Sequence, residues 1–208
     1  MRIGIFGGAF NPVHNGHINL IEAQKRFMQL DKIIIVPTAF PPHKSSENLA
    51  SADDRINMLS LVIHNKDNFS VDITDSLEIS DIEFKRKGKS YTYYTLKAIR
   101  KLYPSDDLFL LIGSDQFLSF KNWYRYKSIL KMASVVAIVR ENNERESVRK
   151  YLEENQKEFF YNCAVCVCKP VVVSSSEIRE KIKKNEDISA LVPAEVSEYV
   201  KDKGLYIV

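Results

Sequence analysis

The residues of this chain that are best suited to chemistry lie near its start, where two histidines follow a glycine-rich turn. Gly7 and Gly8 come directly after a short apolar stretch, and His14 and His17 stand at the beginning of an amphipathic segment. A strand that turns through glycines into the first turn of a helix favours anions, because unpaired backbone N–H groups and the helix dipole meet there. The two imidazoles extend such a site, so we interpret this segment as a site for a chain of phosphate groups.

The spacing within this segment differs from two widespread nucleotide-binding motifs. Gly-x-Gly-x-x-Gly is absent, and neither Gly-Lys-Ser nor Gly-Lys-Thr follows the turn. The residues from Gly8 to His17 instead follow the pattern Gly-x-Phe-x-Pro-x-His-x-Gly-His, in which Phe10 is the aromatic position. The structural alternative is a Rossmann-like first turn whose histidines only pack or cap. We disfavour it because two histidines that bracket a glycine at a helix start have no evident packing role.

A second candidate site lies near the other end of the chain, at Ser174, Ser175, Ser176 and Arg179. Ser174 and Glu177 have the spacing of a capping box, and taken alone the segment reads as an ordinary helix start. Three hydroxyl groups, a helix N-terminus and an arginine in the first turns also make a good cradle for polyphosphate. Two such helix starts, one at each end of the chain, could serve a single triphosphate.

Polar and aromatic segments between the two helix starts supply the remaining candidates. They carry Lys44, Thr92, Gly113, Asp115, Trp123 and Tyr124. Each segment also has a structural reading, as a loop, a capped helix, a turn or a core aromatic, and taken alone each favours structure over function.

In this order and spacing, the segments resemble the bacterial nicotinate-nucleotide adenylyltransferases of the nucleotidyltransferase superfamily with the His-x-Gly-His motif. The two helix starts match the superfamily, whereas Ser-Tyr-Thr-x-x-Thr at 90–95 and the Trp-Tyr pair at 123–124 match the narrower family. The resemblance covers nearly the whole chain, down to Gly204-Leu205-Tyr206. The chain departs from the pattern at four positions: Ala9 and Asn11 stand where Thr and Asp are common, and Val173 and Ser176 replace Ile and Thr.

The resemblance implies an enzyme of NAD biosynthesis that transfers adenylyl from ATP to nicotinate mononucleotide, giving nicotinate adenine dinucleotide and pyrophosphate. It implies that the catalytic residues are His14, His17 and Arg179. The same residues would bind ATP together with Gly7, Gly8, Phe10, Gly113, Asp115, Ser174, Ser175 and Ser176. The acceptor would be bound by Lys44, Thr92, Trp123 and Tyr124. Mg²⁺ is expected as a cofactor held mainly through the ATP phosphates, with no protein site dedicated to the metal.

Several other functions stay open at this point. One is a sister adenylyltransferase that acts on nicotinamide mononucleotide or phosphopantetheine. Another is a catalytically silent, nucleotide-binding regulator. A nucleic-acid-binding module has only the basic run at 85–89 in its favour.

Composition limits the class of protein further. With 208 residues, 45% of them hydrophobic and 27% charged, the chain fits a single domain over residues 1–208. A net charge of +3 is too small to argue for nucleic acid, and no apolar stretch approaches the length of a membrane span. We therefore expect a cytoplasmic, soluble protein. The polar segment 144–159 fits either solvent or a contact between copies of the chain, so a homo-oligomer is left open.

The cysteines Cys163, Cys166 and Cys168 have a spacing that invites a metal site. Three thiolates are one ligand short of a closed zinc site, and every histidine lies at position 64 or earlier. The alternating pattern around them predicts a strand that separates the thiols onto two faces. We therefore favour reduced cysteines that pack in the core over a metal site or a disulfide.

Apolar periodicity predicts the elements that must position these residues. Strands are expected at 3–6, 32–37, 108–113, 134–139 and 165–173, with one or two more pieces within 71–84 at or beside the sheet edge. Helices are expected at 53–64, 92–102, 144–159, 176–184 and 193–203, the last closed by Gly204. A further helix begins near His17, with Leu20, Ala23, Phe27 and Leu30 on its buried face. The alternation predicts a Rossmann-like, doubly wound α/β fold: a mainly parallel sheet with helices on both faces, binding ligands at the carboxyl ends of its strands.

Overall fold

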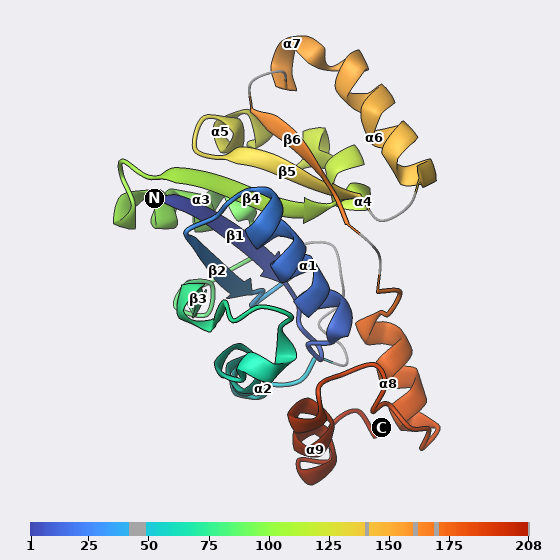
Figure 1. The fold of residues 1–208 in the computed structure, drawn as a ribbon. Coiled ribbons are helices and arrows are strands. Elements are labelled where there is room, and N and C mark those ends of the chain that lie inside the picture. The colour runs from blue at the N-terminus through green and yellow to red at the C-terminus, as the bar shows by residue number, and fades with distance from the viewer. Residues whose placement is uncertain (42–48, 140–141, 160–161, 169–170, 208) are drawn as a thin grey trace.

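The computed structural model describes residues 1–41, 49–139, 142–159, 162–168 and 171–207. Its centre is one parallel sheet in the order β3-β2-β1-β4-β5-β6 (Figure 1). The strands are β1 (Arg2–Gly8), β2 (Lys32–Pro37), β3 (Leu77–Ile79), β4 (Asp107–Gly113), β5 (Ser134–Val139) and β6 (Cys163–Val167). The strand order reverses between β1 and β4, and a ligand crevice is expected at this switch point.

The inner strands are apolar along nearly their whole length because both faces of the sheet are covered. In register, Ile5 of β1 pairs with Ile34 of β2 on one side and with Leu110 of β4 on the other. All three side chains are buried. Such continuous apolar runs are typical of parallel strands that lie between two layers of helices.

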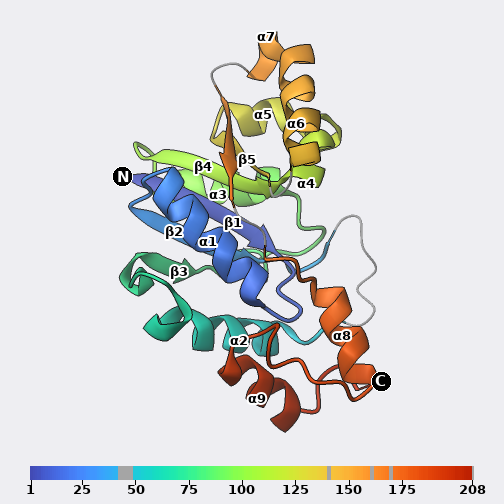
Figure 2. The same cartoon turned by 45° about the vertical axis from the view of Figure 1, so that its right-hand side comes forward.

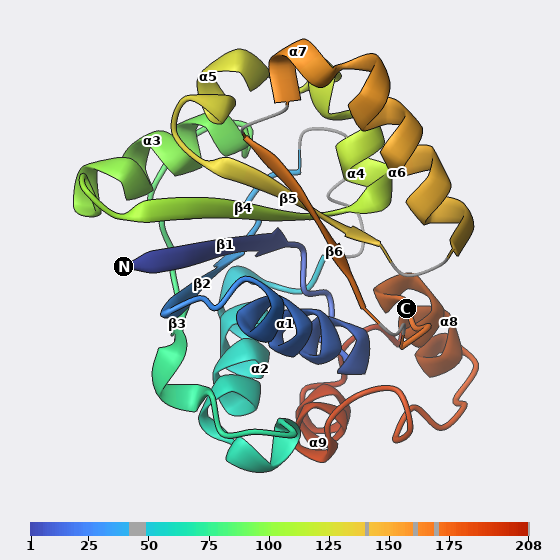
Figure 3. The same cartoon turned by 45° about the horizontal axis from the view of Figure 1, so that its top comes forward.

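Two hydrophobic clusters separate the helices into two layers (Figure 3). One layer comprises α1 (Asn15–Phe27), α2 (Ala52–His64), α8 (Ser175–Lys183) and α9 (Ala194–Asp202). The other comprises α3 (Thr92–Leu102), α4 (Ser114–Leu118), α5 (Tyr126–Leu130), α6 (Asn142–Glu154) and α7 (Gln156–Phe159). Short 3₁₀ helices occur at Lys66–Asn68, Thr74–Ser76 and Phe120–Asn122. The predicted α/β doubly wound fold is therefore confirmed.

The chain crosses back to the α1 side after the last strand. Figures 1 and 2 show α8 beyond the carboxyl end of the sheet, beside the start of α1, and α9 next to α2. Residues from both ends of the sequence therefore meet at the edge of the sheet where ligands are expected. Within the parts that the structure describes, no helix combines the length and the apolar character that a membrane span requires.

The predicted buried face of α1 is partly wrong, and α3 ends in an exposed leucine. Phe27 in the last turn of α1 is 54% exposed, and Leu102 at the end of α3 is 69% exposed. The buried face of α1 is centred on Ile21 and Gln24, so Phe27 lies at its rim. At the end of α3 the following residue, Tyr103, packs against the core in place of Leu102.

Two elements also differ from the prediction, at 163–167 and at 144–159. The last strand runs from Cys163 to Val167 and ends well before the predicted residue 173, because the chain leaves the sheet toward α8. The predicted helix at 144–159 is divided into α6 and α7, with Asn155 between them. The side chain of Asn155 donates to the carbonyl of Tyr151 at 2.8 Å, a local bond that competes with helix continuation. The strand expected within 71–84 is confirmed as one piece, β3, at the edge of the sheet.

The three cysteines are thiols that pack on both faces of the sheet. Cys163 packs against the cluster beneath α3, whereas Cys166 and Cys168 belong to the cluster beneath α1. The predicted separation of the thiols onto two faces is confirmed, and it follows from the alternation of side chains along a strand.

Candidate active site

Two adjoining pockets lie over the carboxyl ends of β1, β2 and β4. The first, of about 640 Å³, is bounded by the β1–α1 turn and the start of α8. The second, of about 430 Å³, is bounded by the ends of β1 and β4, the start of α3 and the Trp123 segment. His17 and Asp115 line both pockets, so they lie at the boundary between the two spaces. Both pockets lie at the predicted switch point.

The turn between β1 and α1 is shaped by Phe10. Its backbone is in the left-handed region, with φ of 49°, and its side chain is fully buried. The Phe10 ring packs against Phe6 and His17, with centroid separations of 5.8 and 4.9 Å. A Cβ on Gly8 would lie 3.0 Å from this ring, so only glycine fits here without displacing Phe10. Gly7 and Gly8 line the second pocket, whereas Phe10 forms part of the wall of the first.

His14 and His17 lie against each other at the start of α1, with ring centroids 3.7 Å apart. The backbone N–H of His14 donates to Nδ1 of His17 at 3.3 Å, so His17 also caps the helix. The packing and capping roles that we had disfavoured are therefore present alongside the pocket position. Because Nδ1 accepts a hydrogen bond, the neutral ring carries its proton on Nε2. His17 is thus held in the form that can donate to an anion.

Gly16, between the two histidines, is a site residue that was not named from the sequence. A Cβ at this position would lie 3.0 Å from Nδ1 of His14 and 3.0 Å from Cγ1 of Val173. The absence of a side chain therefore lets the His14 ring and the segment before α8 approach α1 together. The signal was available, because Gly16 is the glycine of the His-x-Gly-His pattern.

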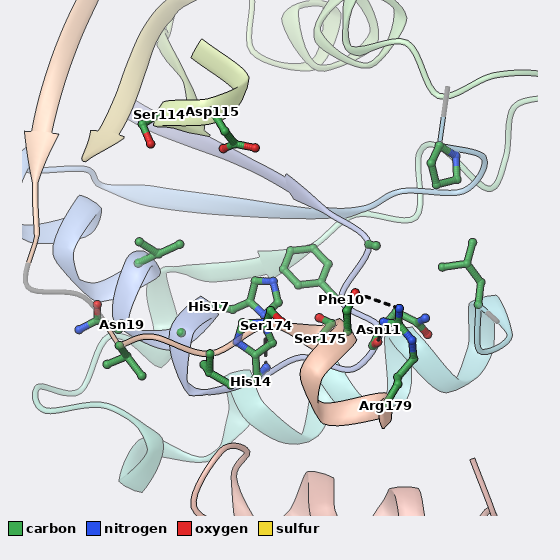
Figure 4. Close-up of a pocket in the computed structure, with 18 of the residues that line it drawn as sticks. Phe10, Asn11, His14, His17, Asn19, Ser114, Asp115, Ser174, Ser175 and Arg179 are labelled. Atoms are coloured by element: carbon green, nitrogen blue, oxygen red, sulfur yellow. Dashed lines mark hydrogen bonds between the residues drawn. The ribbon is translucent and has the colours of Figure 1, made fainter. Parts of the chain in front are cut away.

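The start of α8 is tied directly to the β1–α1 turn (Figure 4). The Ser175 hydroxyl donates to the carbonyl of Pro12 at 2.9 Å, and Nη1 of Arg179 donates to the carbonyl of Asn11 at 2.8 Å. Nη2 of Arg179 donates to Oγ of Ser176 at 3.1 Å. Ser174 is the helix cap, and its hydroxyl accepts from the N–H of Glu177 at 3.1 Å.

The capping role and the pocket position of these residues coexist. The three serines and Arg179 line the first pocket together with His14 and His17. The structure thus brings together the two helix starts from opposite ends of the chain, with their hydroxyl, guanidinium and imidazole groups around one space. This set of donors suits a polyanion.

The second pocket has a different chemical character. Thr92 is the first residue of α3, so the pocket meets a helix N-terminus whose first N–H groups have no partner within the helix. Trp123 is half-buried against Phe120, at a centroid separation of 5.5 Å, and the Tyr124 ring lies tilted against that of Tyr91 at 4.9 Å. The pocket therefore combines aromatic faces with hydrogen-bond donors, which suits a flat ring that carries an anionic group.

The remaining predicted residues lie as follows. Gly113 and Asp115 end β4 and begin α4, and a Cβ on Gly113 would lie 2.7 Å from Oδ1 of Asp115. The glycine thus leaves room for the carboxylate at the boundary of the pockets. Lys44 falls within 42–48, outside the residues that the structure describes.

Glu83 is a second residue that sequence reasoning missed. Its carboxylate is buried at the wall of the second pocket, where it accepts from the Thr95 hydroxyl at 2.6 Å and from the N–H of Ala39 at 3.3 Å. Ser90 and Phe40 exchange two more bonds beside it, of 2.9 and 3.0 Å. The chain leaving β2 is thereby fastened to the start of α3. An acidic residue inside an alternating apolar segment was the available signal.

Arg55 supports the opposite side of the turn. The residue is 2% exposed; its Nη1 donates to the carbonyls of Ala9 and Thr38 at 3.0 and 2.7 Å, and its Nε donates to that of Ala50 at 3.2 Å. Burial lowers the pKa of Arg55 from its ordinary value.

At the rim of the second pocket, the hydroxyls of Tyr94 and Tyr124 lie 3.4 Å apart. Their hydrogen bond raises the pKa of Tyr94 and lowers that of Tyr124.

Comparison with known proteins agrees with this geometry. The model of the family described as cytidylyltransferase-like matches residues 5–181. A Clostridium tetani relative that carries the name nicotinate-nucleotide adenylyltransferase is 37% identical over 97% of each chain. A relative of the same name from Caldicellulosiruptor saccharolyticus is 35% identical over 99% of each. The solved nicotinic acid mononucleotide adenylyltransferase of Plasmodium falciparum has the same fold, with a TM-score of 0.80 and 22% identity over 99% of this chain and 97% of that one.

The family match spans most of the chain, and both relatives align over nearly their full length. The match includes the β1–α1 turn and the start of α8, the two segments that face each other across the first pocket. The chain therefore belongs to the cytidylyltransferase-like family and, within it, to the nicotinate-nucleotide adenylyltransferases.

Proposed function

We propose that this protein transfers the adenylyl group of ATP to nicotinate mononucleotide, forming nicotinate adenine dinucleotide and pyrophosphate in NAD biosynthesis. The observation that carries the proposal is the position of His17, which lines both a pocket rich in anion donors and an aromatic pocket. An imidazole at that boundary suits the phosphate at which the two substrates are joined. The relatives' names and the Plasmodium falciparum neighbour, which was solved with NaAD, support the same reaction.

The chemistry requires positioning more than proton transfer. A phosphate oxygen of the mononucleotide attacks the α-phosphorus of ATP, and the bond from that phosphorus to the oxygen that bridges to the β-phosphate breaks. The attacking phosphate is largely ionised at neutral pH, because the second pKa of a phosphate monoester is about 6. The enzyme therefore needs no general base, and its task is to align two polyanions and stabilise the charge that develops on the departing pyrophosphate.

The first pocket would hold the triphosphate. His14 and His17 would donate to oxygens of the α- and β-phosphates, and the bond from His17 should strengthen in the transition state. Ser174, Ser175, Ser176 and Arg179 would hold the β- and γ-phosphates. Gly7, Gly8 and Phe10 would shape the turn so that the nucleotide approaches the backbone closely, while Gly113 and Asp115 would meet the ribose.

The second pocket would hold the pyridine nucleotide. Trp123 would stack on the pyridine ring, and Thr92, with backbone N–H groups near Tyr124, would bind the carboxylate. From the sequence alone, Lys44 is assigned to the mononucleotide phosphate. A site made of donors should discriminate against nicotinamide, because its NH₂ group would oppose a donor and leave both unpaired.

A divalent ion fits this site as a companion of ATP. Within the described parts of the chain, no group of three or more His, Cys, Asp or Glu side chains could form a metal site. Asp115 is the carboxylate that lines both pockets. Such a sparse set suits Mg²⁺, which keeps waters and phosphate oxygens as ligands, with Asp115 nearby. When bound, the ion would offset the negative charge of the phosphates.

The test is the release of pyrophosphate from ATP and Mg²⁺ with nicotinate mononucleotide, nicotinamide mononucleotide or phosphopantetheine as acceptor. Strong selectivity for the first supports the assignment of both pockets. Preference for another acceptor would retain the phosphate chemistry and overturn the assignment of the second pocket. Binding of ATP without release with any acceptor would indicate a nucleotide-binding regulator.

A further inference from the structure

The C-terminal tail turns back onto the β1–α1 turn. After α9 the chain passes through Gly204, whose φ of 58° lies in the left-handed region. The N–H of Gly204 donates to the carbonyl of Lys201 at 3.1 Å, and that of Leu205 donates to Val200 at 3.0 Å. These two bonds form a Schellman motif, which reverses the chain direction. Leu205 and Tyr206 therefore pack against the core beneath α1 and α2.

Tyr206 then reaches a residue at the centre of the β1–α1 turn. Its hydroxyl donates to Oδ1 of Asn11 at 2.8 Å, and the N–H of Ala50 donates to the same oxygen at 2.9 Å. Burial raises the pKa of Tyr206, so the hydroxyl stays protonated and remains a donor. Asn11 is only 3% exposed, and its carbonyl accepts from Arg179. One residue thus connects the tail, the chain before α2 and the arginine of α8.

The backbone around this connection is held in unusual conformations. Phe10 and Tyr206 both have positive φ, of 49° and 65°. Residues with side chains adopt this region at a cost in free energy, and they remain there where surrounding contacts hold them. Arg55 contributes to those contacts by donating to the carbonyls of Ala9, two residues before Asn11, and of Ala50, whose N–H donates to the Asn11 side chain. The conformation of the turn therefore depends on side chains outside the two pockets.

We propose that Tyr206 is a positioning residue for the triphosphate pocket, acting through Asn11 on the turn that carries His14 and His17 and on Arg179. This inference rests on the proposed function. Without the hydroxyl, Oδ1 of Asn11 keeps the Ala50 contact but loses its tie to the tail. The turn and the guanidinium are then less well held for the phosphates. The second pocket, whose lining includes neither Asn11 nor Tyr206, keeps its shape.

The experiment compares Tyr206→Phe with a matched variant, Tyr199→Phe. The Tyr199 hydroxyl makes a similar contact between α9 and α2, donating to Asp54 at 2.9 Å, but it does not touch the turn. We expect Tyr206→Phe to raise KM for ATP by roughly threefold to tenfold, the loss expected for one hydrogen bond, and to leave KM for nicotinate mononucleotide unchanged. Tyr199→Phe should change neither constant. Equal increases in both KM values, or a loss of thermal stability alone, would overturn the proposal.

Two further measurements separate this proposal from the proposed function. Calorimetric titration with inorganic tripolyphosphate needs no acceptor, and we expect its affinity to fall in Tyr206→Phe by the same factor as KM rises. This fall supports the positioning role even if wild-type protein uses another acceptor, and an unchanged affinity refutes it even if the proposed reaction is confirmed. In the double variant Asn11→Ala/Tyr206→Phe, affinity should fall no further than in Asn11→Ala, because the partner of the hydroxyl is already absent. Additive losses would count against the connection.

Discussion

Two contacts of His17 determine what its imidazole can do. Its Nδ1 accepts from the backbone N–H of His14, and its ring lies against those of His14 and Phe10. The first contact selects the tautomer, and the second fixes the plane of the ring. A donor that is already oriented needs no rearrangement as charge develops on a phosphate oxygen, and such preorganisation is where electrostatic catalysis gains most.

We expect His17→Ala to lower kcat on the order of 100-fold and to raise KM for ATP much less, because the lost donor acts mainly in the transition state. Steady-state kinetics with varied ATP would measure both constants. His64→Ala is the control, since His64 is exposed on α2 and its ring bonds to Ser60. A large rise in KM at constant kcat would instead show that His17 only binds ATP.

Trp123→Ala should raise KM for nicotinate mononucleotide on the order of tenfold, the usual contribution of an aromatic ring stacked on a base, and leave ATP affinity unchanged. Because Trp123 also packs on Phe120, Tyr126→Ala is the matched control. Tyr126 contacts the same ring, at 6.0 Å, but lines neither pocket. Calorimetric titration with each ligand measures the two affinities. Equal losses of affinity for ATP and for the mononucleotide would contradict the stacking role.

At the scale of elements, the shape of the second pocket, where we place the acceptor, depends on how the chain after β2 is joined to α3. Glu83 accepts from the Thr95 hydroxyl and from the N–H of Ala39, and both partners are buried or nearly so. Removing one partner leaves the buried Glu83 carboxylate with an unmet hydrogen bond. The joint between the chain after β2 and α3 should therefore become less rigid. The start of α3, where Thr92 lies, is the element that would move.

We therefore expect Thr95→Val to raise KM for nicotinate mononucleotide by about threefold to tenfold, with little change in KM for ATP. Thr74→Val is a matched control, because the Thr74 hydroxyl donates to Asp72 at 2.7 Å on the exposed surface. The control should leave both constants at wild-type values. An unchanged KM in Thr95→Val would mean that the Glu83 contact supports stability alone.

Local patterns predicted the existence and order of most elements but not all their ends. The apolar runs of β2, β4 and β5 are visible because both faces of the sheet are covered. The break at Asn155 and the early end of β6 were not visible, since they depend on a side-chain bond and on where α8 must lie. The exposure of Phe27 likewise reflects how α1 rotates on the sheet, which periodicity alone leaves open by a fraction of a turn.

At the scale of the whole molecule, the site was predictable where it is a sequence motif and missed where it is a long-range contact. The histidines and serines can be identified in the sequence by their spacing and residue type. The bonds from Arg179 to Asn11, from Thr95 to Glu83 and from Tyr206 to Asn11 join segments that only the folded chain brings together. A buried carboxylate or amide can be suspected from its apolar neighbours, but its partner cannot be named from them.

Burial of the thiols makes the free energy of unfolding of the whole fold decrease at alkaline pH. It raises the pKa of Cys163 to about 12 and that of Cys166 to about 11, from an ordinary value of 9.0. The unfolded chain releases these protons at lower pH than the folded chain does. Stability contributed by the neutral thiols is therefore complete below about pH 9 and is lost as the pH rises through 11 to 12.

We expect the free energy of unfolding in urea to fall between about pH 9 and pH 11, and to fall less in Cys163→Ala/Cys166→Ala. The comparison is the change with pH within each protein, so the cavities left by the substitutions cancel. Parallel declines in the two proteins would show that other groups dominate the alkaline loss.

The meeting of the two helix starts also sets the order in which a newly made chain acquires its parts. The turn after β1 leaves the ribosome early, whereas Ser174 to Arg179 and Tyr206 come near the end of synthesis. The described residues that line the second pocket end at Ile129, so all of them are synthesised before the serines and Arg179 that line the first pocket. Nascent chains and fragments that end before α8 thus lack the hydroxyl and guanidinium groups of the first pocket, so we expect them to be unable to use ATP.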